Sequence, residues 1–342
     1  MASRLYRAHE LAFRTQYAEL KERTLAAGQL LPGTPGSLVL REGTGYPHWY
    51  RVSYPVPGKA QEDWICKDGD SAQLAAMRER MAYHDWAAQQ VSLLRKLGFQ
   101  VADKPVARVL VELHNQNAFA AGLVLVGTLA YMAWLNELGG IVASARTQDI
   151  DLARRQRLKL AAPLPFLATM QATGLPFSAV PGMPSTAPST SVKLPGVQGL
   201  RVDVLAHGDV LGVAIEVPEL DWCAQAVPYY NYLLADAEPG ALLAGGHCIP
   251  VRLPQASRFV WHKLYASTQR QGFPEKATKD RQQALVLGAL IADSECHLLT
   301  QAFQEAPHSM TSAIRPIIGK LIESAGAHAE LADVLRACGD QG

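Results

Sequence analysis

The sequence AGLVLVGTLAYMAWLNELGG, residues 121–140, contains the most apolar stretch of the chain. Residues 122–126 are a short apolar run bounded by glycine, which predicts a buried strand. Residues 129–138 have helical character and stop at two consecutive glycines. Between them, Gly127 would let the backbone approach a phosphate closely, Thr128 offers a hydroxyl, and the helix start offers free N–H groups. The alternative is an ordinary strand-to-helix turn with Thr128 as its N-cap.

Two acids follow in ARTQDIDLA, residues 145–153. Asp149 and Asp151 alternate with apolar residues, as at the edge of a sheet, so both would project from one face of a strand. A third acid, Asp203, lies in LRVDVL, residues 200–205, which predicts a second strand with the same alternation. If these strands are neighbours, three carboxylates converge, and like charges that close repel unless cations lie among them. The alternative is an acid pair in a surface turn or at a strand end.

Carboxylate clusters of this kind are typical of magnesium chemistry. Mg²⁺ prefers carboxylate oxygens and usually leaves coordination positions open for phosphates. Two such ions about 4 Å apart can hold both the attacking and the leaving oxygen of a phosphoryl displacement. The three acids are therefore candidate metal ligands.

The rest of the chain predicts an α+β fold in three parts. Residues 1–104 would form an N-terminal helix with short antiparallel strands, residues 105–253 a core, and residues 254–342 a helical region. Within these parts we expect helices at 5–27, 71–97, 108–120 and 154–173, antiparallel strands within 37–67, further strands at 141–145 and 210–217, and a mobile loop at 174–199.

The composition is that of a globular protein. The chain has 342 residues, of which 49% are hydrophobic and 18% charged, and this rules out wholesale disorder. The formal net charge is only +1, so any contact with nucleic acid must come from a local basic patch. No DNA-binding motif is found.

The cellular location is predicted from the cysteines and from the apolar runs. The five cysteines lie far apart with no C-x-x-C spacing, which favours a reducing compartment over disulfides or a zinc site. The sequence has no secretory signal and no apolar run of the roughly 20 residues that a membrane span needs. We therefore expect a cytoplasmic protein without a membrane partner.

The order of these features resembles the nucleotidyltransferase superfamily with the DNA polymerase beta-type catalytic core. In that superfamily a Gly-Ser or Gly-Gly turn precedes an acid-apolar-acid pair and a third acid on a later strand. Gly127 and Thr128 match the turn, Asp149 and Asp151 the pair, and Asp203 the third acid. The sequences VGTLAYMAW and ARTQDIDLA are most similar to those of bacterial proteins described only as nucleotidyltransferase-like. The resemblance covers roughly residues 105 to 290 and implies a mixed sheet with flanking helices.

A second part of the resemblance lies after the third acid. RFVWHKLYAS and KATKDRQQ are similar to the helical part of the bacterial abortive-infection type, where a Lys and then a Lys-Asp pair follow that acid. Lys263, Lys279 and Asp280 match these places. The resemblance implies that Lys263 or Lys279 faces a triphosphate, and the alternative for each is a solvated helix lysine.

The function that the resemblance implies is transfer of an NMP from an NTP, such as ATP, to a hydroxyl group. Asp149, Asp151 and Asp203 would hold two Mg²⁺ ions, or Mn²⁺ in their place. The nucleotide would be bound by Gly127, Thr128, Lys263 and Lys279. The acceptor is left open among RNA, a protein and a small molecule.

Two questions about function stay open at this point. A basic run follows the acid pair and consists of Arg154, Arg155, Arg157 and Lys159. It could contact RNA phosphates or form the solvent-exposed face of a helix. The chain could also be a non-catalytic, antitoxin-like binding or regulatory protein on the same fold, or an unrelated α/β protein whose acid pair is coincidental. The three acids favour an active enzyme.

Overall fold

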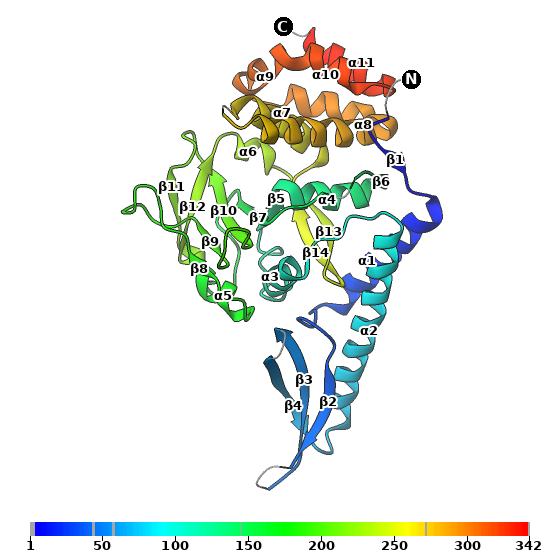
Figure 1. The fold of residues 1–342 in the computed structure, drawn as a ribbon, viewed down its shortest axis with the longest axis vertical. Helices are drawn as coiled ribbons and strands as arrows, with labels where there is room; N and C mark the ends of the chain where they lie inside the picture. Colours follow the sequence, from blue (N-terminus) through cyan, green and yellow to red (C-terminus); the bar gives the residue numbers. More distant parts are fainter. Residues whose placement is uncertain (1–3, 43–44, 57–58, 144, 271, 341–342) are drawn as a thin grey trace.

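The computed structural model describes residues 4–42, 45–56, 59–143, 145–270 and 272–340. The molecule is elongated, with an N-terminal sheet and helix projecting from a central core and a layer of helices covering the opposite end (Figure 1). Helices and several sheets, one of them mixed, confirm the predicted α+β class.

The largest sheet has seven strands and forms the centre of the fold. Its main path runs in the order β11, β12, β10, β7, β5, with β9 also paired to β10 and β8 to β9. The strands are β5 (Val124–Val126), β7 (Asp149–Arg154), β8 (Ser178–Ala179), β9 (Ser191–Lys193), β10 (Arg201–His207), β11 (Ala214–Val217) and β12 (Trp222–Val227).

The acid pair lies in an interior strand and not at the edge of a sheet. Strand β7 runs parallel to β10 on one side and antiparallel to β5 on the other. We predicted an edge strand because acids alternate with apolar residues, which indicates that one face of the strand is polar. The opposite face is closed, since the side chains of Ile150 and Leu152 are fully buried. The pairing with a neighbour on each side, however, makes β7 an interior strand. The expectation of an edge strand was therefore wrong.

Helix α4 (Gly127–Leu138) follows β5 without an intervening loop and ends at Gly139, which has a φ of 76°. All its residues from Thr128 to Asn136 are buried, which explains why the sequence there is apolar on every side. Helix α3 (Lys104–Asn115) also packs into this core, on the hairpin of β13 (Glu238–Ala244) and β14 (His247–Leu253). Sequence analysis did not anticipate this hairpin, although Gly245 and Gly246 form its turn with positive φ angles.

The N-terminal part contains the predicted helix and antiparallel strands. Its strands β2, β3 and β4 form an antiparallel sheet, and β1 pairs with β6 of the core. Helix α1 and the end of α2 pack on β14 of the core. The elements are β1 (Arg7–Ala8), α1 (Leu11–Ala27), β2 (Ser37–Arg41), β3 (His48–Val56), β4 (Lys59–Lys67), α2 (Ser71–Lys96) and β6 (Gly140–Ile141).

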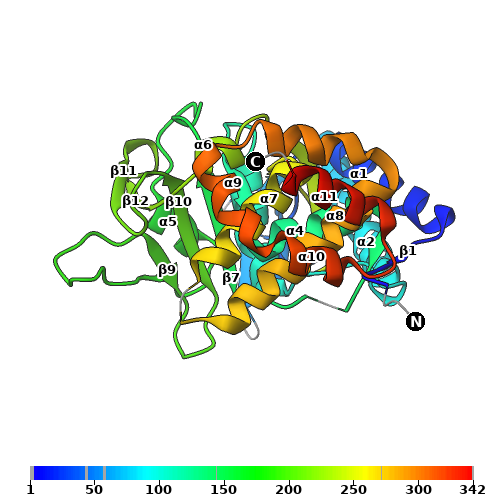
Figure 2. The ribbon, with the colours of Figure 1, turned by 90° about the horizontal axis from the view of Figure 1, so that it is seen from above.

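The region after Pro254 is helical, as predicted. Seen from above, its helices lie over α4 and β7, while β10, β11 and β12 extend to one side (Figure 2). The helices are α7 (Ala256–Gln269), α8 (Pro274–Gln304), α9 (His308–Ile314), α10 (Ile318–Ala325) and α11 (Ala329–Gly339), with a 3-10 turn at Arg315–Ile317. The short helix α6 (Tyr230–Leu233) and the 3-10 turn Pro218–Leu220 precede them.

Four predicted segments differ from the structure. The helix expected at 154–173 is reduced to α5 (Phe166–Ala172), because Pro163 and Pro165 prevent an earlier start. The region 174–199, expected as a loop, contributes β8 and β9 to the sheet. The strands expected at 141–145 and 210–217 are shorter than predicted, and residue 144 lies outside the described residues.

None of the helices in the described ranges combines the length and the apolar character needed to cross a bilayer.

Candidate active site

The pairing of β7 with β10 brings the three predicted acids together. Asp203 lies directly opposite Asp151 in this parallel register, and Asp149 precedes Asp151 by two residues. Paired residues on neighbouring strands project to the same side, and so do residues i and i+2 of one strand. All three carboxylates therefore project from one face of the sheet, which is the arrangement on which the sequence argument depended.

The electrostatics of Asp151 confirm that the acids influence one another. Burial raises the pKa of Asp151 to about 6, and the charges of Asp203 and Asp149 contribute to the increase. Lys263 and Lys279 oppose this increase. Asp151 therefore lies within electrostatic reach of four other charged groups, which come from β7, β10, α7 and α8.

The turn between β5 and α4 touches the acid cluster. Gly127 has a φ of 67°, and a Cβ atom placed on it would lie 1.9 Å from Oδ2 of Asp151. The carboxylate of Asp151 thus occupies the space that a side chain at 127 would need. Only glycine fits this position, because it tolerates the positive φ and leaves room for the acid.

The start of α4 presents polar groups near the acids. The N-cap of the helix is Val126, whose side chain cannot accept a hydrogen bond, so the alternative of Thr128 as N-cap was wrong. Thr128 lies within the first turn and is buried, and its hydroxyl makes no hydrogen bond to another described residue. The first N–H groups of the helix and this hydroxyl are suited to an anion.

Arg201 is a member of the site that sequence analysis missed. Its Nε donates a hydrogen bond to Oδ1 of Asp203 at 2.8 Å, and its Nη2 donates to Oγ of Ser191 at 2.8 Å. Burial raises the pKa of Asp203, and the contact with Arg201 opposes that increase. The period of two in strand β10 could have identified Arg201, because it places residues 201 and 203 on one face.

Lys263 enters the site as part of a buried ion-pair network. Its Nζ donates to Oδ1 of Asp280 at 3.2 Å, and Nε of Arg270 donates to Oδ2 of the same acid at 2.6 Å. Burial raises the pKa of Asp280, but the two cations hold it below its usual value. The alternative of a solvated helix lysine is therefore wrong for Lys263, whereas Lys279 is exposed.

Tyr230, in α6, is a second residue that sequence analysis missed. Its ring is buried and meets the ring of His262 edge-on, with the centroids 5.2 Å apart. Burial raises its pKa, and Asp151 raises it further, which places the phenol near the acids. No short sequence signal identifies this tyrosine, because only tertiary packing brings α6 to the strand.

The three carboxylates are the type of ligand that magnesium and manganese prefer, although they do not form a complete coordination shell. Among the described residues, no three His, Cys, Asp or Glu side chains are already gathered at coordinating separation. Asp203 is paired with Arg201 instead. Mg²⁺ is usually bound by one or two carboxylates together with substrate phosphates and waters, so a closed protein cage is not required.

The basic run after the acid pair does not form a helix. Arg154 is the last residue of β7, and its Nη1 lies 3.2 Å from Oε1 of the buried Glu219. Arg155, Arg157 and Lys159 are exposed in a segment without regular structure. The prediction of a solvent-exposed helix face was therefore wrong, because β7 passes directly into an irregular connection.

The comparisons with known proteins agree with this geometry. A protein-family model described as nucleotidyltransferase matches residues 104–308, which include the turn, the three acids and both lysines. The match covers more than half of the chain, and the chain therefore belongs to the nucleotidyltransferase family. This family transfers nucleotidyl groups, and its substrate is a nucleoside triphosphate. No curated protein matches the sequence.

Proposed function

We propose that this chain is an active, metal-dependent nucleotidyltransferase that moves an NMP from an NTP to a hydroxyl group of an acceptor. The observation that carries the proposal is the register of β7 and β10. It sets Asp151 opposite Asp203, with Asp149 on the same face. A family match alone would not distinguish an active member from one that has lost its acids.

The three acids would hold two Mg²⁺ ions, or Mn²⁺ ions in their place. When bound, such ions polarise the α-phosphate and lower the pKa of the acceptor hydroxyl. Arg201 donates to Oδ1 of Asp203 and so holds this carboxylate in place on the shared face. The pKa of Asp151, about 6, is low enough for the carboxylate to be ionised at neutral pH.

The other predicted residues would bind the triphosphate. The free N–H groups at the start of α4 and the hydroxyl of Thr128 favour phosphate oxygens. Lys279 is exposed near the acids and can offset the charge of the departing pyrophosphate. Burial lowers the pKa of Lys263, but its ion pair with Asp280 opposes this and holds the ammonium group in one place. The nucleotide chosen, for which ATP is one candidate, stays a prediction.

A non-catalytic, antitoxin-like role is less consistent with the site. Burial raises the pKa of Asp151, and the charges of Asp203 and Asp149 raise it further, so the folded state opposes the ionisation of this acid. A protein that only binds a partner has no need for such an arrangement, whereas a metal-binding site does. The abortive-infection type and the bacterial origin likewise stay predictions.

The cysteines support the predicted location. All five are unpaired: Cys66, Cys223, Cys248, Cys296 and Cys338. A reducing compartment keeps thiols in this state, so we extend the proposal to a cytoplasmic enzyme.

The experiment that tests the proposed function is label transfer. The purified chain is incubated with Mg²⁺ and each α-³²P-labelled nucleoside triphosphate, with cell RNA, cell protein or a metabolite extract as acceptor. Asp149→Asn/Asp151→Asn serves as the matched variant. Label on one of the three pools with the natural chain, reduced at least about 100-fold in the variant, supports the proposal. The absence of transfer to every pool, together with the absence of Mg²⁺-dependent triphosphate binding, favours the non-catalytic role.

A further inference from the structure

Tyr230 lies in α6, the short helix that packs on β10 of the central sheet and on α7 of the helical layer (Figure 1). Its side chain is only 7% exposed, and its ring meets that of His262 edge-on. His262 directly precedes Lys263 in α7, and Nζ of Lys263 donates a hydrogen bond to Asp280. The ring of Tyr230 is therefore fixed beside the ion-pair network of the candidate active site.

The hydroxyl group of Tyr230 makes no hydrogen bond to any residue in the described part of the chain. Its oxygen is not fully enclosed, so it reaches solvent. By contrast, the hydroxyl of Tyr232, which lies in the same helix and is equally buried, donates to the carbonyl of Ala302 at 2.7 Å. A polar group that stays unpaired at the end of a tightly packed ring requires an explanation, and binding of a ligand is one.

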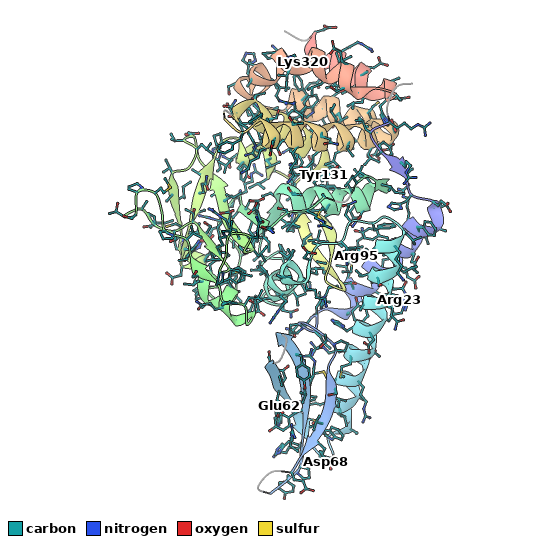
Figure 3. All side chains as sticks on the ribbon, viewed as in Figure 1. Arg23, Glu62, Asp68, Arg95, Tyr131 and Lys320 are labelled. Carbon is teal, nitrogen blue, oxygen red and sulfur yellow. The ribbon has the colours of Figure 1, made fainter. Side chains whose placement is uncertain are left out.

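The charges that act on this phenol show what surrounds it. Burial raises the pKa of Tyr230, and the charge of Asp151 raises it further. By contrast, burial alone raises the pKa of Tyr131, which Figure 3 shows at α4 next to the helical layer. The other charges that act on Tyr230 are those of Arg270, Asp280 and Asp203. Its hydroxyl is therefore within electrostatic reach of both the acid cluster and the ion-pair network, and it keeps its proton at neutral pH.

The turn before α6 is held in an unfavourable conformation. Tyr229 is left-handed, with a φ of 60°, which is rare for a bulky residue. Its hydroxyl donates to Oγ of Ser309 at 2.8 Å, and its ring meets that of Tyr265 edge-on. Strained backbone of this kind persists only where surrounding contacts maintain it, and it is concentrated at active sites and ligand clamps. The chain therefore maintains strain at the residue that directly precedes the unpaired phenol.

The surroundings of the hydroxyl favour an anion as its partner. Lys263 and Arg270 both contact the carboxylate of Asp280, so this network carries one net positive charge when both cations are protonated. Lys279, which precedes Asp280 in α8, is exposed and adds a second positive charge. A protonated phenol donates its strongest hydrogen bonds to ionised oxygens. Phosphate oxygens satisfy both the cations and the phenol.

We propose that Tyr230 binds the triphosphate tail of the nucleotide, and that its hydroxyl donates a hydrogen bond to a non-bridging oxygen of the β- or γ-phosphate. This inference rests on the proposed function, because it concerns the substrate of the same reaction. The hydroxyl is near the acids, which would hold the metal ions, and near the cations, which attract the end of the tail. The contact distinguishes a triphosphate from a monophosphate, because a monophosphate has no β- or γ-phosphate.

A contact of Tyr230 with the base or the sugar is less consistent with the structure. The ring is packed against that of His262 and is almost entirely buried, so it offers no open face on which a base could stack. A sugar hydroxyl could accept a hydrogen bond from the phenol, but hydrogen bonds to ionised groups are roughly twice as strong as those between neutral groups. The nearby cations also favour the anionic part of the nucleotide.

The test compares two tyrosine-to-phenylalanine variants of the full chain. Tyr230→Phe removes the unpaired hydroxyl, and Tyr232→Phe removes the bonded hydroxyl from the same helix. Isothermal titration calorimetry in Mg²⁺ measures the binding of inorganic tripolyphosphate, of each nucleoside triphosphate and of each nucleoside monophosphate. Differential scanning calorimetry without ligand gives the Tm, and a Mn²⁺ titration without phosphate measures the acid cluster separately.

We expect Tyr230→Phe to bind tripolyphosphate and the preferred nucleoside triphosphate at least about tenfold more weakly, because a hydrogen bond to a charged group is lost. The affinities for monophosphates and for Mn²⁺ should not change. The Tm should not fall, because the hydroxyl bonds to no other described residue. Tyr232→Phe should show the opposite pattern, with unchanged phosphate affinities and a Tm lower by about 1–3 °C.

Several results would overturn the inference. Undetectable tripolyphosphate binding by the natural chain, or equal phosphate affinities in the natural chain and Tyr230→Phe, would remove the contact. Equal losses in both variants would attribute the effect to the fold. A loss for nucleoside triphosphates but not for tripolyphosphate would place the hydroxyl at the sugar or base, and a loss of Mn²⁺ affinity without phosphate would show that it acts through the acids.

The same experiment separates this inference from the proposed function. If tripolyphosphate binding follows the expectation while the natural chain transfers no label, the proposed function fails and the phosphate contact stands. If the natural chain transfers label while Tyr230→Phe binds tripolyphosphate as tightly as the natural chain does, only this inference fails.

Discussion

At the scale of single residues, the burial of Asp151 beside two like charges opposes its ionisation. The pKa rises from a usual value of 3.8 to about 6 in the folded chain. Below pH 4 the carboxyl is protonated in both the folded and unfolded states, and the shift has no effect. Between pH 4 and 6 the unfolded chain releases the proton first, so the free energy of unfolding falls as the pH rises.

Asp151→Asn should therefore stabilise the metal-free chain above pH 6. We expect the free energy of unfolding to increase by roughly 1–3 kcal/mol at pH 8, since one pKa unit corresponds to about 1.4 kcal/mol. The gain should be smaller at pH 5. Urea unfolding in EDTA measures it, with the fully exposed Asp209→Asn as the control that should not change. A variant less stable than the natural chain at pH 8 would contradict the account of Asp151.

The two lysines should respond differently to substitution. Lys263→Met removes one partner of a buried pair and leaves Asp280 with Arg270 alone, which should cost about 3 kcal/mol of stability. Lys279→Met changes an exposed side chain, so the free energy of unfolding should change by less than about 0.5 kcal/mol. We expect Lys279→Met nevertheless to weaken NTP binding. Urea unfolding and NTP titration measure both effects, and equal stability losses would argue against a buried role for Lys263.

At the scale of elements, the junction of β5 with α4 depends on the absence of a side chain at residue 127. Gly127→Ala would place a methyl group against Asp151 and would force the alanine into a left-handed conformation. We expect a loss of about 2–4 kcal/mol of stability, together with the loss of most transfer activity. Gly196→Ala is the matched control, because Gly196 also has a positive φ but its added methyl group meets nothing within 4 Å.

The control should cost about 1–2 kcal/mol from backbone strain alone and should leave the activity intact. Calorimetric melting and label transfer separate the two contributions. If Gly127→Ala retains activity, the carboxylate of Asp151 is not held against the turn as we describe.

Local patterns predicted the elements of the site better than they predicted their surroundings. Alternation in β7 and β10 is a property of each strand, so the sequence was sufficient to place Asp149, Asp151 and Asp203 on strand faces. The neighbours of β7 depend on pairing between distant segments, and for that reason an interior strand was mistaken for an edge. Arg201 was missed although its spacing was informative, whereas Tyr230 reaches the site only through the packing of α6.

At the scale of the whole molecule, the predicted boundary near residue 104 crosses a shared hydrophobic cluster. Tyr17 of α1, Leu94 of α2 and Leu243 of β13 are buried together in it. The hydroxyl of Tyr17 also donates a hydrogen bond to Glu137 Oε1 in α4 at 2.9 Å. The first helix and the end of the second thus form part of the core surface, while the three-stranded sheet projects away (Figure 1).

A fragment of residues 105–342 should therefore fail to fold as a stable unit. Removing α1 and α2 exposes the apolar side of β13 and β14, and the loss of several buried side chains exceeds the usual margin of stability. Circular dichroism melting and gel filtration test this, with the full chain as the reference. A cooperative transition within a few degrees of that of the full chain would show that the core is independent.

The measurement that tests the central claim most directly is the number of Mn²⁺ ions bound in the presence of nucleotide. Electron paramagnetic resonance of free Mn²⁺ counts them during titration of the chain with each nucleoside triphosphate and no acceptor. The account predicts two protein-dependent sites with at least one triphosphate for the natural chain. It predicts the loss of at least one site in Asp151→Asn and in Asp203→Asn, but not in Asp209→Asn. Equal Mn²⁺ binding by the natural chain and all three variants would contradict it.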